Sequence, residues 1–224
     1  MTRTQSTPQF ELYFSARSPF ARRIRVALAN LRVPFEGKEI SVFEPPADFL
    51  KISPLGLVPV LVVKQTDQET LVIPDSSAIL EYLNEPGNLP SPQGDSTFGI
   101  WPNNTDKPWA RAASTLAAGV MQHTVNHFLE SLKKAPDTET TNEASERIVA
   151  TLTNLNELLK GKQHLFINRS KATTQTGFDL VIALDYLSLR IPALDWNTQF
   201  SEFQNLVTLA YSNQAMQSTR PPKT

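Results

Sequence analysis

The sequence predicts an α/β domain followed by an all-α helical domain. Strand-like and helix-like patterns of apolar residues alternate over about the first 85 residues, and strand patterns stop after Trp109. Between the two parts lies a stretch rich in proline, glycine and asparagine, which is typical of a linker. We therefore expect a first domain at 1–86, a linker at 87–108 and a helical domain at 109–224.

The first domain is expected to follow the order β-α-β-α-β-β-α. Strand segments alternate apolar and polar residues or run apolar, whereas helix segments repeat their apolar residues every three or four positions. Pro34 ends the first helix, and Asp75 or Ser76 caps the last one. The expected elements are, in order, a strand at 10–14, a helix at 19–33, a strand at 35–42, a short helix or turn at 46–54, a hairpin of strands at 58–64 and 69–74, and a helix at 75–85.

The second domain shows only helical patterns, at 109–135, 143–162, 176–192 and 201–218. The segment at 176–192 is apolar almost all round, so it is predicted to be a buried central helix. The segment at 201–218 has one apolar face, which predicts a last amphipathic helix.

The composition excludes several kinds of chemistry. The 224 residues include no cysteine, which rules out disulfides, thiolate metal sites and a cysteine nucleophile. The formal net charge of −1 gives no reason to expect nucleic acid or an anionic membrane as a partner. No apolar run reaches the roughly 20 residues that cross a bilayer, and the N-terminus lacks the apolar core of a signal peptide, so a cytoplasmic location is expected. His123 and His127 share a helix face without a visible third ligand, and no metal site is predicted.

Ser18 and Pro19 can be interpreted in two ways. Serine is a favoured N-cap and proline suits the first helical position, so the pair starts a helix. A helix N-terminus also offers free N–H groups and partial positive charge to an anion, and a hydroxyl there can donate to a thiolate. The local sequence by itself favours the cap.

Two further stretches carry the same ambiguity. Pro59 is tolerated at the start of a strand, or it marks a bend that exposes the Val58 backbone for pairing with an extended, peptide-like ligand. Asp75 and Ser76 cap a helix, or they hold a zwitterionic amino-acid end, with the ligand's ammonium on Asp75 and its carboxylate on Ser76.

Taken together, four motifs in order resemble the glutathione transferase superfamily, over nearly the whole chain. They are LYFSARSPFARRIRVALANLRVPFE, SPLGLVPVLV, IPDSSAILEYL and TGFDLVIALDYL. The Ser-Pro-Phe triplet is similar to that of serine-type, bacterial-style members. The resemblance implies a thioredoxin-like N-terminal domain that binds glutathione, a loop with a cis-proline, and a capping box in the helical domain with Thr176 as N-cap and Asp179 at N3.

The resemblance also implies the roles of individual residues. Ser18 would donate a hydrogen bond to the glutathione sulfur and so stabilise the thiolate nucleophile, with Ser15 as the second choice. Val58, ahead of Pro59, would pair with the cysteinyl part of glutathione. Asp75 and Ser76 would hold the γ-glutamyl end.

One departure from the family concerns the glycyl end of glutathione. Leu57 lines the expected site at a position where many members have a lysine that holds the glycyl carboxylate. Arg22 is the candidate to replace that lysine. Arg17, Arg22, Arg23 and Arg25 stand where the carboxylates of glutathione would arrive, and most of them are expected to lie on a solvated face.

The resemblance predicts a homodimeric glutathione transferase with glutathione as co-substrate and no metal. Its second substrate would be a small apolar electrophile, bound by the helix at 109–135, the last helices and the linker. One alternative is a non-catalytic glutathione-binding module with an interaction or regulatory role. Another is a glutathione-dependent peroxidase or isomerase on the same fold.

Overall fold

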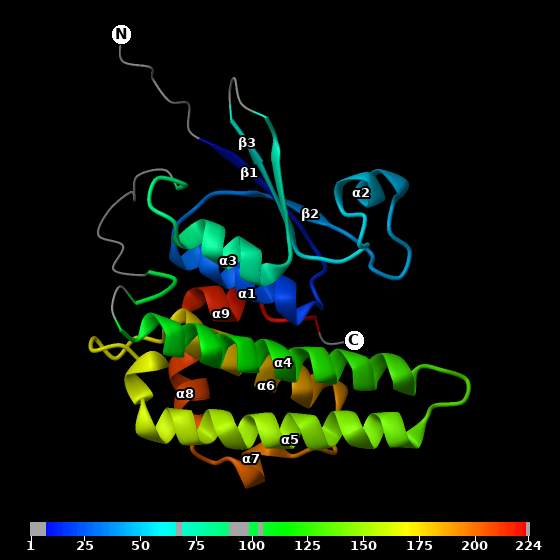
Figure 1. Ribbon diagram of the computed structural model, residues 1–224, viewed down its shortest axis with the longest axis vertical. Helices are drawn as coiled ribbons and strands as arrows, with labels where there is room; N and C mark the ends of the chain where they lie inside the picture. The colour runs from blue at the N-terminus through cyan, green and yellow to red at the C-terminus, as the bar shows by residue number, and fades with distance from the viewer. Residues whose placement is uncertain (1–7, 66–68, 90–98, 103–104, 223–224) are drawn as a thin grey trace. The chain divides into compact units, whose positions relative to one another are not determined.

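The computed structural model describes residues 8–65, 69–89, 99–102 and 105–222 (Figure 1). These residues form two compact units. The first runs to Ile100 and also includes the chain from Ser218 onward, and the second is Trp101–Gln217. An α/β unit with a following helical unit confirms the predicted fold class. Of the linker expected at 87–108, residues 90–98 and 103–104 lie outside the described residues.

The first unit is built on a four-stranded sheet with the strand order β2-β1-β3-β4. β1 pairs in parallel with β2 and antiparallel with β3, and β3 pairs antiparallel with β4. Tyr13, Val60 and Pro74 stand in one row across three neighbouring strands. The C-terminal ends of β1 and β4 therefore lie at the same end of the sheet as the start of β3. The strands are β1 (Gln9–Phe14), β2 (Glu36–Glu39), β3 (Val60–Lys64) and β4 (Leu71–Pro74).

Helices cover β3 on both faces, which explains its continuous apolar run. Phe49 of α2 (Ala47–Ile52) packs with Val60 and Val62. Because side chains alternate along a strand, Leu61 and Val63 point to the opposite face, and they are also buried. Figure 1 shows α1 (Pro19–Asn30) and α3 (Ser76–Asn84) side by side, with α2 apart from them.

The second unit packs α4 against α5 and α6. As predicted, α6 is the buried central helix, with only four of its positions reached appreciably by solvent. In the described part of the chain, no helix is both long enough and apolar enough to cross a membrane. The helices are α4 (Lys107–Ser131), α5 (Thr138–Gly161), the 3-10 helix η1 (Gln163–Leu165), α6 (Gln175–Arg190), α7 (Trp196–Gln199), α8 (Phe203–Ala210) and α9 (Gln214–Ser218), the last of which ends in the first unit.

The start of α6 corrects one expectation. The N-cap is Thr174 and not Thr176, because the Thr174 hydroxyl accepts the Gly177 N–H at 3.2 Å. The Thr176 hydroxyl instead donates to the Ala110 carbonyl of α4. Asp179 is fully buried and accepts hydrogen bonds from side chains of α4 and α6, so it joins two helices and does not close a capping box with Thr176.

The single helix expected at 201–218 is also wrong, because the structure has two. α8 ends at Ala210, and α9 begins at Gln214 after a turn. The Asn213 side-chain oxygen accepts the Ala215 N–H at 2.8 Å, which is the geometry of a helix start. The apolar spacing continues across this turn, so the pattern does not reveal the break.

Candidate functional site

Ser18 is the N-cap of α1, the helix that follows β1 in the chain. Its backbone is extended and its Oγ accepts the Ala21 N–H at 3.2 Å, with Pro19 in the first turn. The cap occupies a lone pair of the hydroxyl and leaves its proton available. Within the described ranges, no acceptor for that proton is found. The capping role is therefore observed, and it leaves the hydroxyl able to donate to a ligand.

The loop before β3 holds Val58 in a defined position. The Ser53 hydroxyl donates to the Leu57 carbonyl at 3.1 Å, and the Gly56 N–H donates to the Ser53 carbonyl at 2.9 Å. Gly56 has φ +65°, a conformation that suits glycine. The Val58–Pro59 peptide bond is cis, and the Val58 side chain is buried against Phe49. Among the residues described, none makes a hydrogen bond to the Val58 amide or carbonyl.

Asp75 is the N-cap of α3. Its φ of +72° is rare for a residue other than glycine, and its carboxylate accepts the N–H groups of Ser77 and Ala78. A backbone in this region costs free energy of order 1–3 kcal/mol, which the cap and the surrounding structure must offset. The carboxylate is exposed, so it can also meet a ligand.

The Ser76 hydroxyl accepts a hydrogen bond from the buried guanidinium of Arg23. The Arg23 Nη1 donates to the Ser76 Oγ at 3.0 Å, and each residue is only 1% exposed. Because the hydroxyl accepts from arginine, its own proton is free to point elsewhere. A guanidinium at the start of α3 also adds positive charge to a helix N-terminus that already favours anions.

The buried arginines overturn the expectation of a solvated face for Arg22 and Arg23. Arg22 is 2% exposed, and its Nε donates to the Thr219 hydroxyl at 3.4 Å. Burial, and secondarily the charge of Arg22, lower the pKa of Arg25, whose guanidinium lies over the Phe14 ring. The hydrogen bond with Thr219 directs the Arg22 side chain into the interior of the first unit. The role of Arg22 as a glutathione ligand stays a prediction.

Sequence reasoning missed Arg23 as the partner of Ser76. One signal was present, because Arg23 shares a helix face with the apolar Val26 and Ala27 at spacings of three and four. That signal predicts burial of Arg23, but it does not identify Ser76, which lies 53 residues further along the chain.

The sheet register brings three of the predicted site segments together. Ser18 follows the end of β1, Val58 precedes the start of β3, and Asp75 follows the end of β4. All three strand ends meet at the row of Tyr13 and Val60 described above. This end of the sheet therefore carries a hydroxyl, an unpaired peptide group and two helix N-termini. Ser15, the second choice, lies at the same end, where its carbonyl accepts the Ser18 N–H at 3.0 Å.

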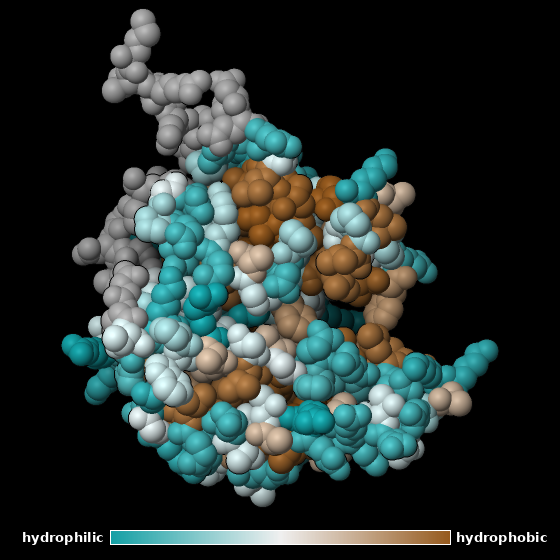
Figure 2. Space-filling model, in the orientation of Figure 1, coloured by the Kyte–Doolittle hydropathy of each residue, from teal (hydrophilic) through white to brown (hydrophobic). Residues whose placement is uncertain are grey.

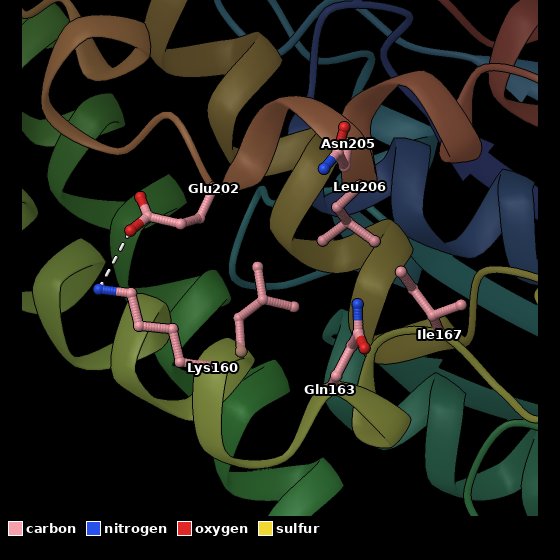
Figure 3. Close-up of a pocket in the computed structure, with 7 residues that line it drawn as sticks. Lys160, Gln163, Ile167, Glu202, Asn205 and Leu206 are labelled. Carbon is pink, nitrogen blue, oxygen red and sulfur yellow. Dashed lines mark ion pairs between the residues drawn. The ribbon is translucent and has the colours of Figure 1, made fainter.

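A separate pocket lies within the second unit (Figure 3). It has a volume of about 280 Å³, and the Lys160 ammonium pairs with the Glu202 carboxylate at its edge over 3.1 Å. None of the predicted site residues lines it. Within the described ranges, no three His, Asp or Glu side chains are placed to hold a metal ion. The pocket is lined by Leu159, Lys160, Gln163, Ile167, Glu202, Asn205 and Leu206.

Residues 17–85 match the family described as "Glutathione S-transferase, N-terminal domain". The chain is 39% identical over 67 residues to FtsZ-localized protein A of Caulobacter vibrioides, covering 30% of this chain and 29% of that protein. It is 39% identical over 85 residues to glutathione S-transferase 1 of Dianthus caryophyllus, covering 37% and 36%. The chain thus spans about a third of the length of these curated relatives.

The solved structures extend the likeness to both units. A glutathione S-transferase from Methylobacterium radiotolerans, solved in complex with glutathione sulfonate, superposes with a TM-score of 0.81 at 22% identity and 96% coverage of both chains. At that identity the likeness shows the fold, and the family match covers residues 17–85. Residues 17–85 therefore match the glutathione S-transferase N-terminal domain, and the chain as a whole shares the fold of a solved glutathione S-transferase.

Proposed function

We propose that the chain is a serine-type glutathione transferase, which joins the sulfur of glutathione to a small apolar electrophile. The observation that carries this proposal is the meeting of Ser18, Val58 and the start of α3 at one end of the sheet. These groups match the three parts of glutathione in kind: a hydroxyl for the sulfur, a free peptide group for the cysteinyl backbone, and an N-terminal helix site for the γ-glutamyl carboxylate.

In the proposed mechanism, Ser18 keeps the bound thiol ionised. The hydroxyl donates to the sulfur while its oxygen stays capped on Ala21. A free thiol has a pKa of about 8.5, and lowering it by two units takes about 3 kcal/mol. A hydrogen bond to a charged group supplies roughly 1.5–3 kcal/mol and a helix N-terminus up to about 2 kcal/mol. Together these two contributions suffice without a metal or a base.

The ionised sulfur then attacks the electrophile. With a chloronitrobenzene, a C–S bond forms, the C–Cl bond breaks, and chloride leaves with the bonding electron pair. The thiol proton goes to water before the attack. The protein would act as a cytoplasmic homodimer.

The γ-glutamyl end would be held by Asp75 and Ser76. The exposed Asp75 carboxylate meets the ammonium, while the hydroxyl and the backbone N–H of Ser76, the first residue of α3, meet the carboxylate. Arg23 holds the Ser76 hydroxyl by donating to its oxygen, so the hydroxyl proton is left to donate to the ligand.

Conjugation of glutathione to 1-chloro-2,4-dinitrobenzene tests the proposal. We expect Ser18→Ala to reduce kcat by about 10- to 150-fold, which is the value of the lost hydrogen bond, and to raise the pKa of the bound thiol, measured by the ultraviolet absorption of the thiolate. Ser18→Thr keeps both the hydroxyl and the cap and should retain activity. Ser15→Ala is the matched control and should change little. Equal activity of the native chain and Ser18→Ala would overturn the role of Ser18.

One observation favours a second candidate function, a glutathione-binding interaction module without catalysis. A relative that matches the first unit is named for its localisation with FtsZ. If calorimetry shows glutathione binding, and assays of conjugation, peroxide reduction and isomerisation all show no turnover, this second function replaces the first.

A further inference from the structure

The first unit exposes three leucines beside the loop that carries Val58. Leu55 is 69% exposed, Leu57 63% and Leu50 of α2 41%. Leu50 lies next to Gly56, since a Cβ built on this glycine would stand 3.6 Å from Leu50 Cδ2. Figure 2 shows hydrophobic residues gathered on this face where Figure 1 places α2. We name Leu50, Leu55 and Leu57 the leucine surface.

The leucine surface lies where the third residue of a bound tripeptide would arrive. If the cysteinyl residue pairs with Val58, the next residue lies about 3.3 Å further along, beside Leu57 or Pro59. Pro59 is buried and leads into β3. The C-terminal end of the peptide therefore passes Leu57, whose side chain is open to solvent.

The loop that carries Leu57 and Val58 supplies no positive charge of its own. The segment 53–59 contains no charged residue. The nearest cation in the preceding sequence is Lys51, which pairs with the Asp48 carboxylate at 2.7 Å. Arg22 contacts Thr219 and is almost fully buried. A carboxylate beside the leucine surface would lose hydration without gaining a charged partner.

We infer that this site takes γ-glutamyl-cysteinyl thiols with an uncharged or apolar C-terminal end in preference to those with a free glycyl carboxylate. The inference rests on the proposed function, because it uses Val58 as the cysteinyl partner. It assigns a specificity-determining role to Leu57, with Leu50 and Leu55 as apolar neighbours. An ester or amide at the glycyl end meets this surface without the cost of desolvating a charge.

Binding of glutathione and of its glycyl ethyl ester, measured by calorimetry on the full chain, tests the inference. We expect the native chain to bind the ester at least about threefold more tightly than the acid. Leu57→Lys should reverse the preference by roughly three- to tenfold, the range between an exposed ion pair and a charge-assisted hydrogen bond. Leu71→Lys, at an exposed leucine of β4, is the matched control and should leave the ratio unchanged. Lys51→Gln should also leave it unchanged.

The outcomes separate the inference from the proposed function. Binding of neither thiol overturns both. Tighter binding of the acid to the native chain, with a ratio that Leu57→Lys does not move, overturns the inference alone. A shift of oligomeric state in Leu57→Lys at a constant ratio would assign the leucine surface to a contact with a second copy, and it also overturns the inference.

Discussion

Arg23 of α1 and Ser76 of α3 are joined by a hydrogen bond of 3.0 Å between two side chains that solvent hardly reaches. The bond links the second turn of one helix to the first residue of the other. Both helices begin at the end of the sheet where the glutathione site is proposed. The same contact therefore serves the packing of the first unit and the orientation of a proposed ligand group.

We predict that Arg23→Gln weakens glutathione binding more than it slows the chemical step. The Ser76 hydroxyl loses its fixed orientation, so KM for glutathione should rise about tenfold while kcat changes less than about threefold. The free energy of unfolding should fall by about 2 kcal/mol, since a buried hydrogen-bond partner is lost. Steady-state kinetics and urea denaturation measure the two effects. Arg147→Gln, at an exposed arginine of α5, is the control, and an unchanged KM in Arg23→Gln would contradict the prediction.

Two glycines of the second unit should respond to alanine in opposite directions. A Cβ on Gly177 would lie 2.4 Å from the Phe166 carbonyl oxygen, so Gly177→Ala should lower the free energy of unfolding by more than about 3 kcal/mol. Gly119 lies inside α4 with no atom near its Cβ position, and Gly119→Ala should raise that free energy by about 0.5–1 kcal/mol. Thermal and urea denaturation provide the measurement. Similar effects of both substitutions would show that close packing does not decide the cost at Gly177.

The connection between α4 and α5 should weaken in acid. The Lys133 side chain and then the Asp137 N–H lower the pKa of Glu130, since both donate to its carboxylate. A lowered folded-state pKa means that the carboxylate stabilises the fold above its unfolded pKa of about 4.3 and loses that effect as the pH falls through the folded value. Glu130→Gln should therefore lower Tm at pH 7, and the difference from the native chain should shrink below about pH 4.

The control for the acid experiment is Glu143→Gln. Glu143 and Arg147 form an ion pair of 3.6 Å in which both side chains are largely exposed, so this variant should leave Tm nearly unchanged. A difference between Glu130→Gln and the native chain that stays constant from pH 7 to pH 3 would show that Glu130 acts through packing and not through its charge.

The sequence predicted the elements of the fold better than the partners of individual side chains. Apolar spacing and capping residues are local signals, and they identified all four strands of the first unit and the starts of α1 and α3. The cap of α6 was placed two residues late, because threonines at 173, 174 and 176 offer similar hydroxyls and only the backbone conformation decides among them. The turn between α8 and α9 carries no proline or glycine and was missed.

The same contrast between local signals and distant partners holds for the candidate site. Ser18, Val58 and Asp75 are visible because each stands beside a proline or a helix start. Arg22 and Arg23 are adjacent in sequence, yet their partners lie 197 and 53 residues away. The helix-face spacing indicates burial of Arg23, but no local pattern identifies the partner of either guanidinium, because those partners lie far away in the sequence.

The first unit, which runs to Ile100, also includes the chain from Ser218 onward. Thr219 is 5% exposed and receives the hydrogen bond from Arg22 of α1. During synthesis, the ribosome makes α1 early but delivers Thr219 only after the whole helical unit has been translated. The hydrogen bond from Arg22 to Thr219 can therefore form only after the helical unit has been made, and a nascent chain halted before residue 218 lacks this bond.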